Sequence, residues 1–210
     1  MWGGWYHDRQ ILTELERMRQ ITEAAMSKAT AGLPSAETVL FIDEKAYANN
    51  VRGTALIDSV NRIRVAMGNT GIPFQQCMVE DAAEVLPHCR AAIFTAPLPS
   101  EAGEAAMELC KKRKIPYLHS TVSKSAFSTS KLRDFLTASG VHCYNSDGCV
   151  VYCGNGYLGV HCVFSGEVRI ALPKQCTVKP LLGSGVVSLE NNILTVTMKK
   201  HDTALFELMD

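Results

Sequence analysis

The sequence predicts an α/β protein that is followed by a separate all-β part. Between residues 35 and 147, short apolar runs alternate with helical patterns, and after residue 148 only short β runs separated by turn signals remain. The first apolar run, Thr38–Ile42, is rich in β-branched and aromatic residues and ends at Asp43. Such a run indicates a strand buried on both faces, and it places Asp43 at the carboxyl edge of a parallel sheet, where ligands bind.

Residues 1–34 are expected to form an aromatic segment and an amphipathic helix. Asp8 can cap a helix that runs to about residue 30 and carries Ile11, Leu15 and Met18 on one face. This apolar face has no partner before it, so it packs either on the following domain or on something upstream. Trp2 and Trp5 either staple the helix start or form an aromatic platform for a sugar ring or a partner chain.

Residues 35–147 are expected to form a doubly wound α/β domain. Strands and helices alternate in a way that predicts a mostly parallel, five-stranded, flavodoxin-like sheet. The predicted strands are 38–42, 74–79, 90–96, 115–119 and 141–144, and the predicted helices are 51–68, 81–86, 100–114 and 131–139, with Asp81 and Ser100 as caps.

Residues 148–210 are expected to form a small antiparallel β domain, either a sandwich or a partly open barrel. The predicted strands are 150–153, 157–164, 167–172, 177–181, 186–189, 193–198 and 204–208. The stretch from Gly154 to Gly159 matches G-x-G-x-x-G, but a strand pattern follows it where a dinucleotide site needs a helix. Asn155-Gly156 therefore predicts a hairpin turn.

Composition excludes several classes of protein. The 210 residues carry a net charge of zero, which argues against a nucleic-acid partner, and no apolar run approaches the ~20 residues of a membrane span. The first residues do not resemble a signal peptide, so a cytoplasmic location is expected. The eight cysteines show no CxxC pair and are expected to be free, buried thiols; a zinc site from Cys149, Cys153 and His161 is conceivable, but its spacing argues against it.

The predicted sheet lacks the residues for its usual chemistry. The loop 43–50 has no glycine and two carboxylates, so it would repel the phosphate of FMN. No G-x-C-x-G or G-x-S-x-G is present, which argues against a class I glutamine amidotransferase-like hydrolase. Asp43, Glu44 and Asp81 are expected to be solvated loop acids and a helix cap. No catalytic residue, cofactor or metal is therefore predicted.

The chain resembles the C-terminal region of glycoside hydrolase family 42-like β-galactosidases. The resemblance rests on the segment from Trp2 to Asp8 (WGGWYHD), the helix after it, and the run 39–44. Residues 166–173 and 202–206 also resemble the terminal β domain of that family. Those enzymes consist of a catalytic TIM barrel, a flavodoxin-like trimerisation domain related to class I glutamine amidotransferases, and a small β domain.

The resemblance implies a role without catalysis of its own. Residues 8–30 would match the last barrel helix and residues 38–144 the trimerisation domain, while the catalytic glutamates of the family lie upstream of anything matched here. Trp2 and Trp5 would contribute to a sugar site only with a barrel present. The implied function is a non-catalytic oligomerisation region in carbohydrate metabolism, as a homo-oligomer (a trimer) or with a barrel-containing partner.

Two alternatives remain open. The first is a stand-alone amidotransferase-like hydrolase whose nucleophile the motifs do not reveal. The second is a carbohydrate-binding surface on the β domain that uses Tyr152 and Tyr157, whose simpler interpretation is as ordinary hairpin aromatics.

Overall fold

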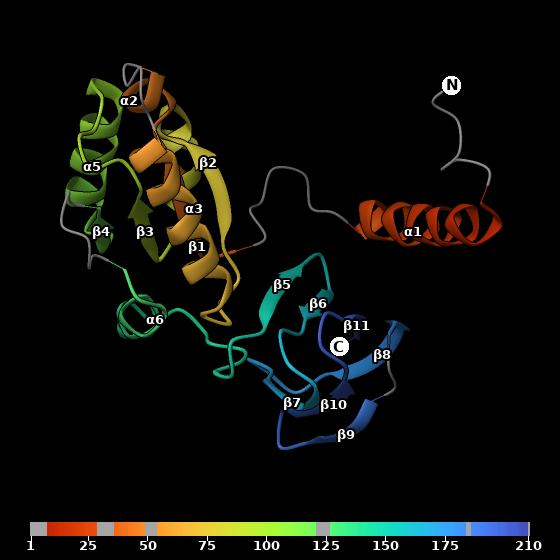
Figure 1. Ribbon diagram of the computed structural model, residues 1–210. Helices are drawn as coiled ribbons and strands as arrows, with labels where there is room; N and C mark the ends of the chain where they lie inside the picture. Colours follow the sequence, from red (N-terminus) through yellow and green to blue (C-terminus); the bar gives the residue numbers. More distant parts are fainter. Residues whose placement is uncertain (1–7, 29–35, 49–53, 121–126, 184–185, 210) are drawn as a thin grey trace.

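The computed structural model describes residues 8–28, 36–48, 54–120, 127–183 and 186–209 (Figure 1). It shows a helix, an α/β part and an antiparallel β part. The helices are α1 (Arg9–Lys28), α2 (Glu44–Ala48), α3 (Thr54–Gly68), α4 (Ala82–Val85), α5 (Glu101–Arg113) and α6 (Thr129–Ala138), with short 3₁₀ helices η2 (Val79–Asp81) and η3 (Leu86–His88) on either side of α4. The strands of the α/β part are β1 (Thr38–Ile42), β2 (Gln75–Met78), β3 (Ala91–Phe94) and β4 (Tyr117–His119).

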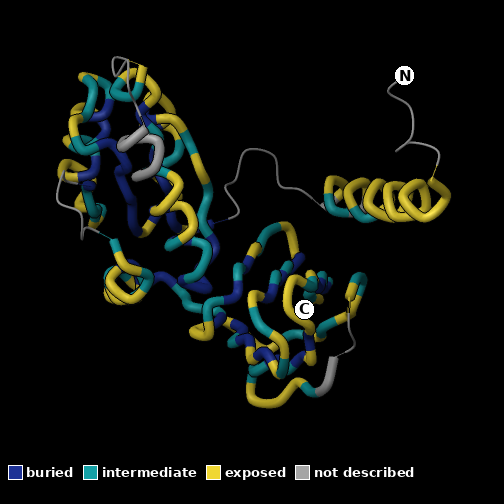
Figure 2. The backbone as a smooth tube through the Cα atoms, in the orientation of Figure 1, coloured by how far each residue is buried: buried dark blue, intermediate teal, exposed yellow. Residues whose placement is uncertain are grey.

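The α/β part is a parallel sheet covered on both faces. Its four strands lie in the order β2-β1-β3-β4, and β1 pairs in parallel with β2 and β3. On one face Val39 and Phe41 pack in a core with α4 and α5, and on the other Leu40 packs with Met67 of α3 and Leu136 of α6. Figure 2 shows this buried centre. The prediction that the first apolar run is a strand buried on both faces is confirmed.

The sheet has four strands among the described residues, and the prediction of a fifth at 141–144 was wrong. The backbone groups of this segment bond elsewhere: Val141 N donates to Leu136 O, and Tyr144 N donates to Gly71 O. The segment therefore closes α6 and leads into the β part instead of extending the sheet. The loop predicted after β1 contains the short helix α2, whose first residues follow Asp43 directly.

The β part consists of two antiparallel sheets that share one core. Its strands are β5 (Val150–Gly154), β6 (Tyr157–His161), β7 (Gly166–Ala171), β8 (Thr177–Leu182), β9 (Val186–Glu190), β10 (Ile193–Met198) and β11 (Thr203–Met209). One sheet has the order β7-β10-β9 and the other β5-β6-β11-β8. Leu158, Val168, Leu194 and Phe206 meet in the core. All predicted β runs are strands, and Asn155 (φ 52°) and Gly156 (φ 79°) form the predicted hairpin turn.

The two parts meet at a closely fitted junction around Gly71 and Asn145. Asn145 is buried; its amide donates to Arg169 O at 2.9 Å, and its Oδ1 accepts from Cys149 N at 3.1 Å. Gly71 has φ +70°, and a Cβ there would lie 1.7 Å from Asn145 O. Only glycine fits this contact, because the conformation is left-handed and the carbonyl occupies the space of a side chain.

Helix α1 lies beside the β part and is exposed along most of its length (Figures 1 and 2). Asp8 caps it as predicted, because its Oδ1 accepts from Gln10 N at 2.8 Å. The guanidinium of Arg17 donates to Leu181 O of β8 at 2.5 Å. The helix therefore forms and touches the β part, while its apolar face stays uncovered by the described residues.

Replacing Gly71 should break the junction between the two parts. We expect Gly71→Ala to lower the free energy of unfolding by about 3 kcal/mol or more, because the methyl group collides with Asn145 O in a left-handed backbone. Urea unfolding measures the loss. Gly148→Ala is the matched control: Gly148 also has positive φ (+92°), but nothing lies within 4 Å of its added Cβ, so we expect a loss of about 1–2 kcal/mol. Equal losses in both variants would contradict this account.

Candidate functional site

The carboxyl edge of the parallel sheet is where a ligand of an α/β fold would bind, and Asp43 lies there as predicted. Asp43 is buried, with 2% of its surface exposed. Its Oδ1 accepts from Ala46 N at 3.0 Å in α2, and its Oδ2 accepts from Ser100 N at 2.7 Å before α5. The carboxylate therefore ties β1 to the first turns of two helices.

Helix α5 approaches Asp43 closely because Gly103 has no side chain. A Cβ on Gly103 would lie 2.4 Å from Asp43 Oδ2. Ser100 caps α5 as predicted, with Oγ accepting from Gly103 N at 3.3 Å. The carboxylate thus lies between a cap and a glycine, in a space that the chain itself fills.

The other polar groups at this edge also bond within the chain. Tyr47 donates to Thr95 Oγ1 at 2.7 Å, and Thr95 donates in turn to Phe41 O at 2.9 Å. Burial raises the pKa of the Tyr47 phenol, and the nearby Asp43 carboxylate adds to the effect. A ring nitrogen of His119 bonds Ala96 O at 2.7 Å. This network holds loops together, and it does not form an acid–base pair around a cleft.

The three acids have different environments, which corrects one expectation. Asp43 was expected to be a solvated loop acid and is instead buried and bonded to backbone N–H groups. Glu44 and Asp81 are exposed as expected. Asp81 occupies the N-cap position of α4, but its side chain makes no capping hydrogen bond, so its predicted role as a cap was wrong.

The cysteines are all free thiols, four of them buried and four half-buried. Burial raises the pKa of Cys77, Cys89 (to about 11), Cys110 (to about 12), Cys143, Cys149 (to about 12) and Cys153. A cysteine nucleophile needs the opposite shift, because the thiolate is the reactive form. These six thiols therefore lack the environment that a cysteine hydrolase requires.

The residues considered for a zinc site form hydrogen bonds with separate partners. The Cys149 thiol bonds Cys162 Sγ at 3.6 Å inside the core, and a ring nitrogen of His161 bonds Thr203 Oγ1 at 3.0 Å. Within the described ranges, no three His, Cys, Asp or Glu side chains are grouped to hold a metal ion.

The aromatic candidates fall into two groups. Trp2 and Trp5 lie outside the described residues. Tyr157 is buried at 8% exposure, whereas Tyr152 is 63% exposed, so the two do not form one surface.

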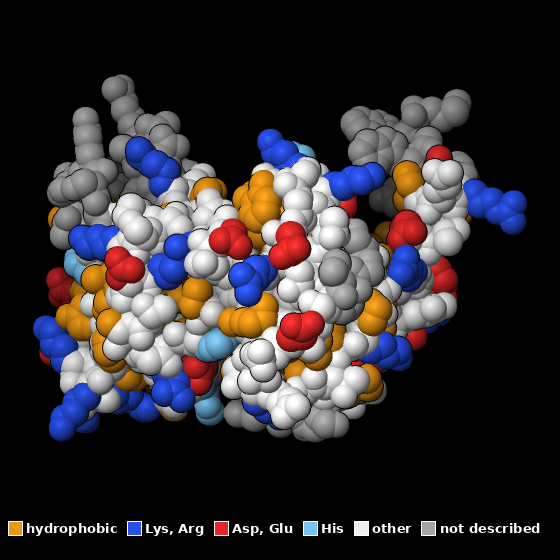
Figure 3. Space-filling model, turned by 90° about the horizontal axis from the view of Figure 1, so that it is seen from below, with side chains coloured by type: hydrophobic (Ala, Val, Ile, Leu, Met, Phe, Trp, Pro, Cys, Tyr) orange, Lys and Arg blue, Asp and Glu red, His pale blue; other side chains and the backbone are white. Residues whose placement is uncertain are grey.

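On the face seen in Figure 3, acidic and basic side chains are interspersed. No helix in the part of the chain that the structure describes is both long and apolar enough to cross a membrane.

Comparison with solved structures finds the same fold in glycoside hydrolases of family 42. The exo-carrageenase GH42 from Bacteroides ovatus superposes with a TM-score of 0.50 at 10% identity, over 83% of this chain and 29% of the enzyme. The β-galactosidase from Bacillus circulans sp. alkalophilus superposes with a TM-score of 0.52 at 11% identity, over 82% of this chain and 41% of the enzyme. No protein-family model and no curated protein matches the sequence. This chain therefore shares the fold of a part of these enzymes and spans less than half of their length.

Removing the charge of Asp43 should cost stability. We expect Asp43→Asn to lower the free energy of unfolding by about 1–3 kcal/mol. In the native protein both carboxylate oxygens accept a hydrogen bond from a backbone N–H, whereas in the variant the NH₂ group of the asparagine would face one of these donors. Urea unfolding measures the change. The exposed neighbour provides the control: Glu44→Gln should change stability by less than about 0.5 kcal/mol. Equal free energies of unfolding for the two variants would show that the hydrogen bonds of Asp43 do not stabilise the end of β1.

Proposed function

We propose that this chain is a non-catalytic accessory and assembly region of a β-galactosidase-like glycoside hydrolase, and that it acts in carbohydrate metabolism. The observation that carries the proposal is the apolar face of α1, which none of the described residues covers. The likeness to two family 42 enzymes over most of this chain supports it. The filled sheet edge supports it as well, because Asp43 and its neighbours are engaged in holding the fold.

The apolar face of α1 is too extensive for a helix meant to stay in water. Its large apolar side chains are 42–71% exposed; they are Ile11, Leu12, Leu15, Met18 and Met26. Arg19 forms ion pairs with Glu16 and Glu23 along the border of this face. A helix with one charged and one apolar face is stabilised mainly by packing of the apolar face.

A (β/α)8 barrel, in the same or another chain, would supply the cover for α1. The helix would then take the place of the last barrel helix, and Trp2 and Trp5 would lie beside the sugar site of that barrel. The α/β part would be a flavodoxin-like assembly domain through which the protein forms a homo-oligomer, a trimer. In this proposal residues 1–34, 35–147 and 148–210 are the three functional units.

The proposal predicts that the apolar face of α1 contributes little to the stability of this chain alone. Leu15→Ala should change the free energy of unfolding by less than about 0.5 kcal/mol, because Leu15 is 46% exposed. Leu132→Ala is the matched comparison. Leu132 is a fully buried leucine of α6, so this substitution should lower the free energy of unfolding by about 2–5 kcal/mol. Urea unfolding of the purified chain compares the two.

A loss of 2 kcal/mol or more in Leu15→Ala would contradict the proposal. In that case α1 would pack on its own chain in solution, and its apolar face would not be reserved for a barrel. Similar midpoints for Leu15→Ala and the unmodified chain would support the proposal.

A further inference from the structure

A groove lies between the α/β part and the β part. One hollow of about 470 Å³ is lined by α3, β2 and β5, and a second of about 420 Å³ is lined by β5, β6 and β11. Phe74 and Tyr152 line both, so the two hollows adjoin at these two rings. A third hollow of about 610 Å³ shares Asn61, Val65 and Asn69 with the first, but it lies within the α/β part, between α3 and the start of α6. We call the first two hollows, which are lined by residues of both parts, the interdomain groove.

Tyr152 is an exposed aromatic surface in the middle of the interdomain groove. It pairs with Gly159 across β5 and β6, and a Cβ on Gly159 would lie 3.6 Å from Tyr152 Cβ and 3.9 Å from its Cδ2. The ring therefore lies against the glycine strand, which holds it in place, while 63% of the residue remains exposed. Phe74 adds a half-buried aromatic neighbour from the other part.

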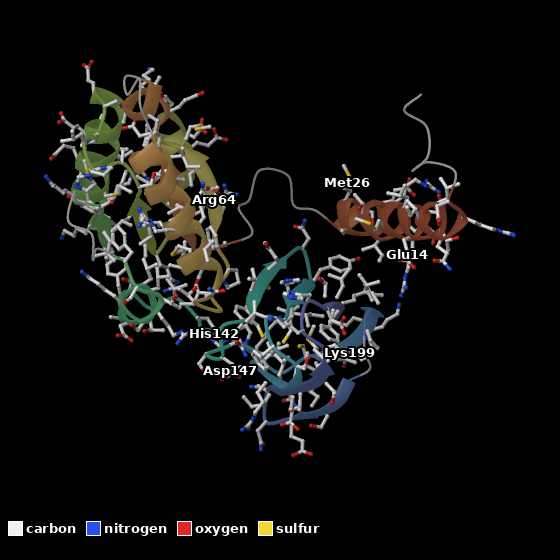
Figure 4. The ribbon with its side chains drawn as sticks, viewed as in Figure 1. Glu14, Met26, Arg64, His142, Asp147 and Lys199 are labelled. Atoms are coloured by element: carbon white, nitrogen blue, oxygen red, sulfur yellow. The ribbon has the colours of Figure 1, made fainter. Side chains whose placement is uncertain are left out.

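The polar side chains lining the groove include several amides, the hydroxyl of Thr203 and one arginine, Arg64. Asn61, Asn69 and Gln76 each offer a carbonyl oxygen and an NH₂ group, and Arg64 extends from α3 (Figure 4). Among the described residues, no Asp or Glu lines any of the three hollows. Amides donate to and accept from hydroxyl groups at once, and a guanidinium binds a carboxylate or sulfate in a two-pronged manner.

This combination favours an acidic saccharide over other extended ligands. A sugar ring presents a C–H face that packs on an aromatic ring, and hydroxyl groups around its edge that need both donors and acceptors. Nucleic acid would need several phosphate contacts, whereas Arg64 is the one basic side chain lining the first hollow and the chain carries no net charge. An apolar peptide would offer no anionic partner to Arg64.

We propose that the interdomain groove binds an oligosaccharide that carries carboxylate or sulfate groups, with Tyr152 as the stacking platform and Arg64 as the contact to the anionic group. The lining of the groove includes no residue of α1 and none of the carboxyl edge around Asp43. Its test therefore does not depend on whether the chain docks on a barrel.

Calorimetric titration of the full chain with tetragalacturonate, with neutral galactotetraose as the comparison, tests the proposal. We expect tetragalacturonate to bind and galactotetraose to bind at least tenfold more weakly. Tyr152→Ala should weaken binding at least tenfold, while Tyr152→Phe, which keeps the ring, should bind within about twofold of the unmodified chain. Arg64→Gln should remove the preference for the acidic sugar.

Arg113→Gln is the control for the loss of a positive charge. Arg113 is exposed at the end of α5, and α5 packs on the face of the sheet opposite to α3. It should bind tetragalacturonate as the unmodified chain does. Urea unfolding confirms that each variant is folded. The proposal is overturned if tetragalacturonate does not bind at millimolar concentration, if Tyr152→Ala binds as well as the unmodified chain, or if Arg113→Gln reduces binding as much as Arg64→Gln.

Discussion

The end of β1 depends on one buried carboxylate. Asp43 follows a strand whose residues are buried on both faces, so its charge enters the protein and must be satisfied there. Backbone N–H groups of α2 and of the turn before α5 satisfy it at 3.0 and 2.7 Å. The edge where an α/β sheet binds a ligand is for this reason filled by the chain itself, and the Asp43 carboxylate holds β1, α2 and the start of α5 together there.

A second constraint fixes the β part on the α/β part. The contact between Gly71 and Asn145 O leaves no room for a side chain, and the buried amide of Asn145 bonds the backbone of β7. Two folds that are each common alone are thereby held in one arrangement. The same arrangement places Tyr152 of β5 opposite Phe74, which creates the interdomain groove.

Most helices, strands and turns could be predicted from the sequence, because the residue patterns that determine them lie within a few neighbouring positions. The β runs after residue 148, the caps at Asp8 and Ser100, and the Asn155-Gly156 turn were all predicted correctly. The segment 141–144 was not, because its apolar residues face the core while its backbone bonds Gly71 and β7. Tyr152 and Tyr157 look alike in the sequence, and only the pairing of the sheets shows that one is exposed and the other buried. The partner of Asp43 before α5 is 57 residues away, beyond any local pattern.

The central proposal is that the α/β part serves assembly. Light scattering of the purified chain over a dilution series tests it most directly. The account predicts a mass three times that of the 22.9 kDa chain that stays constant on dilution. A mass of one chain at every concentration would contradict self-assembly as the role of this protein.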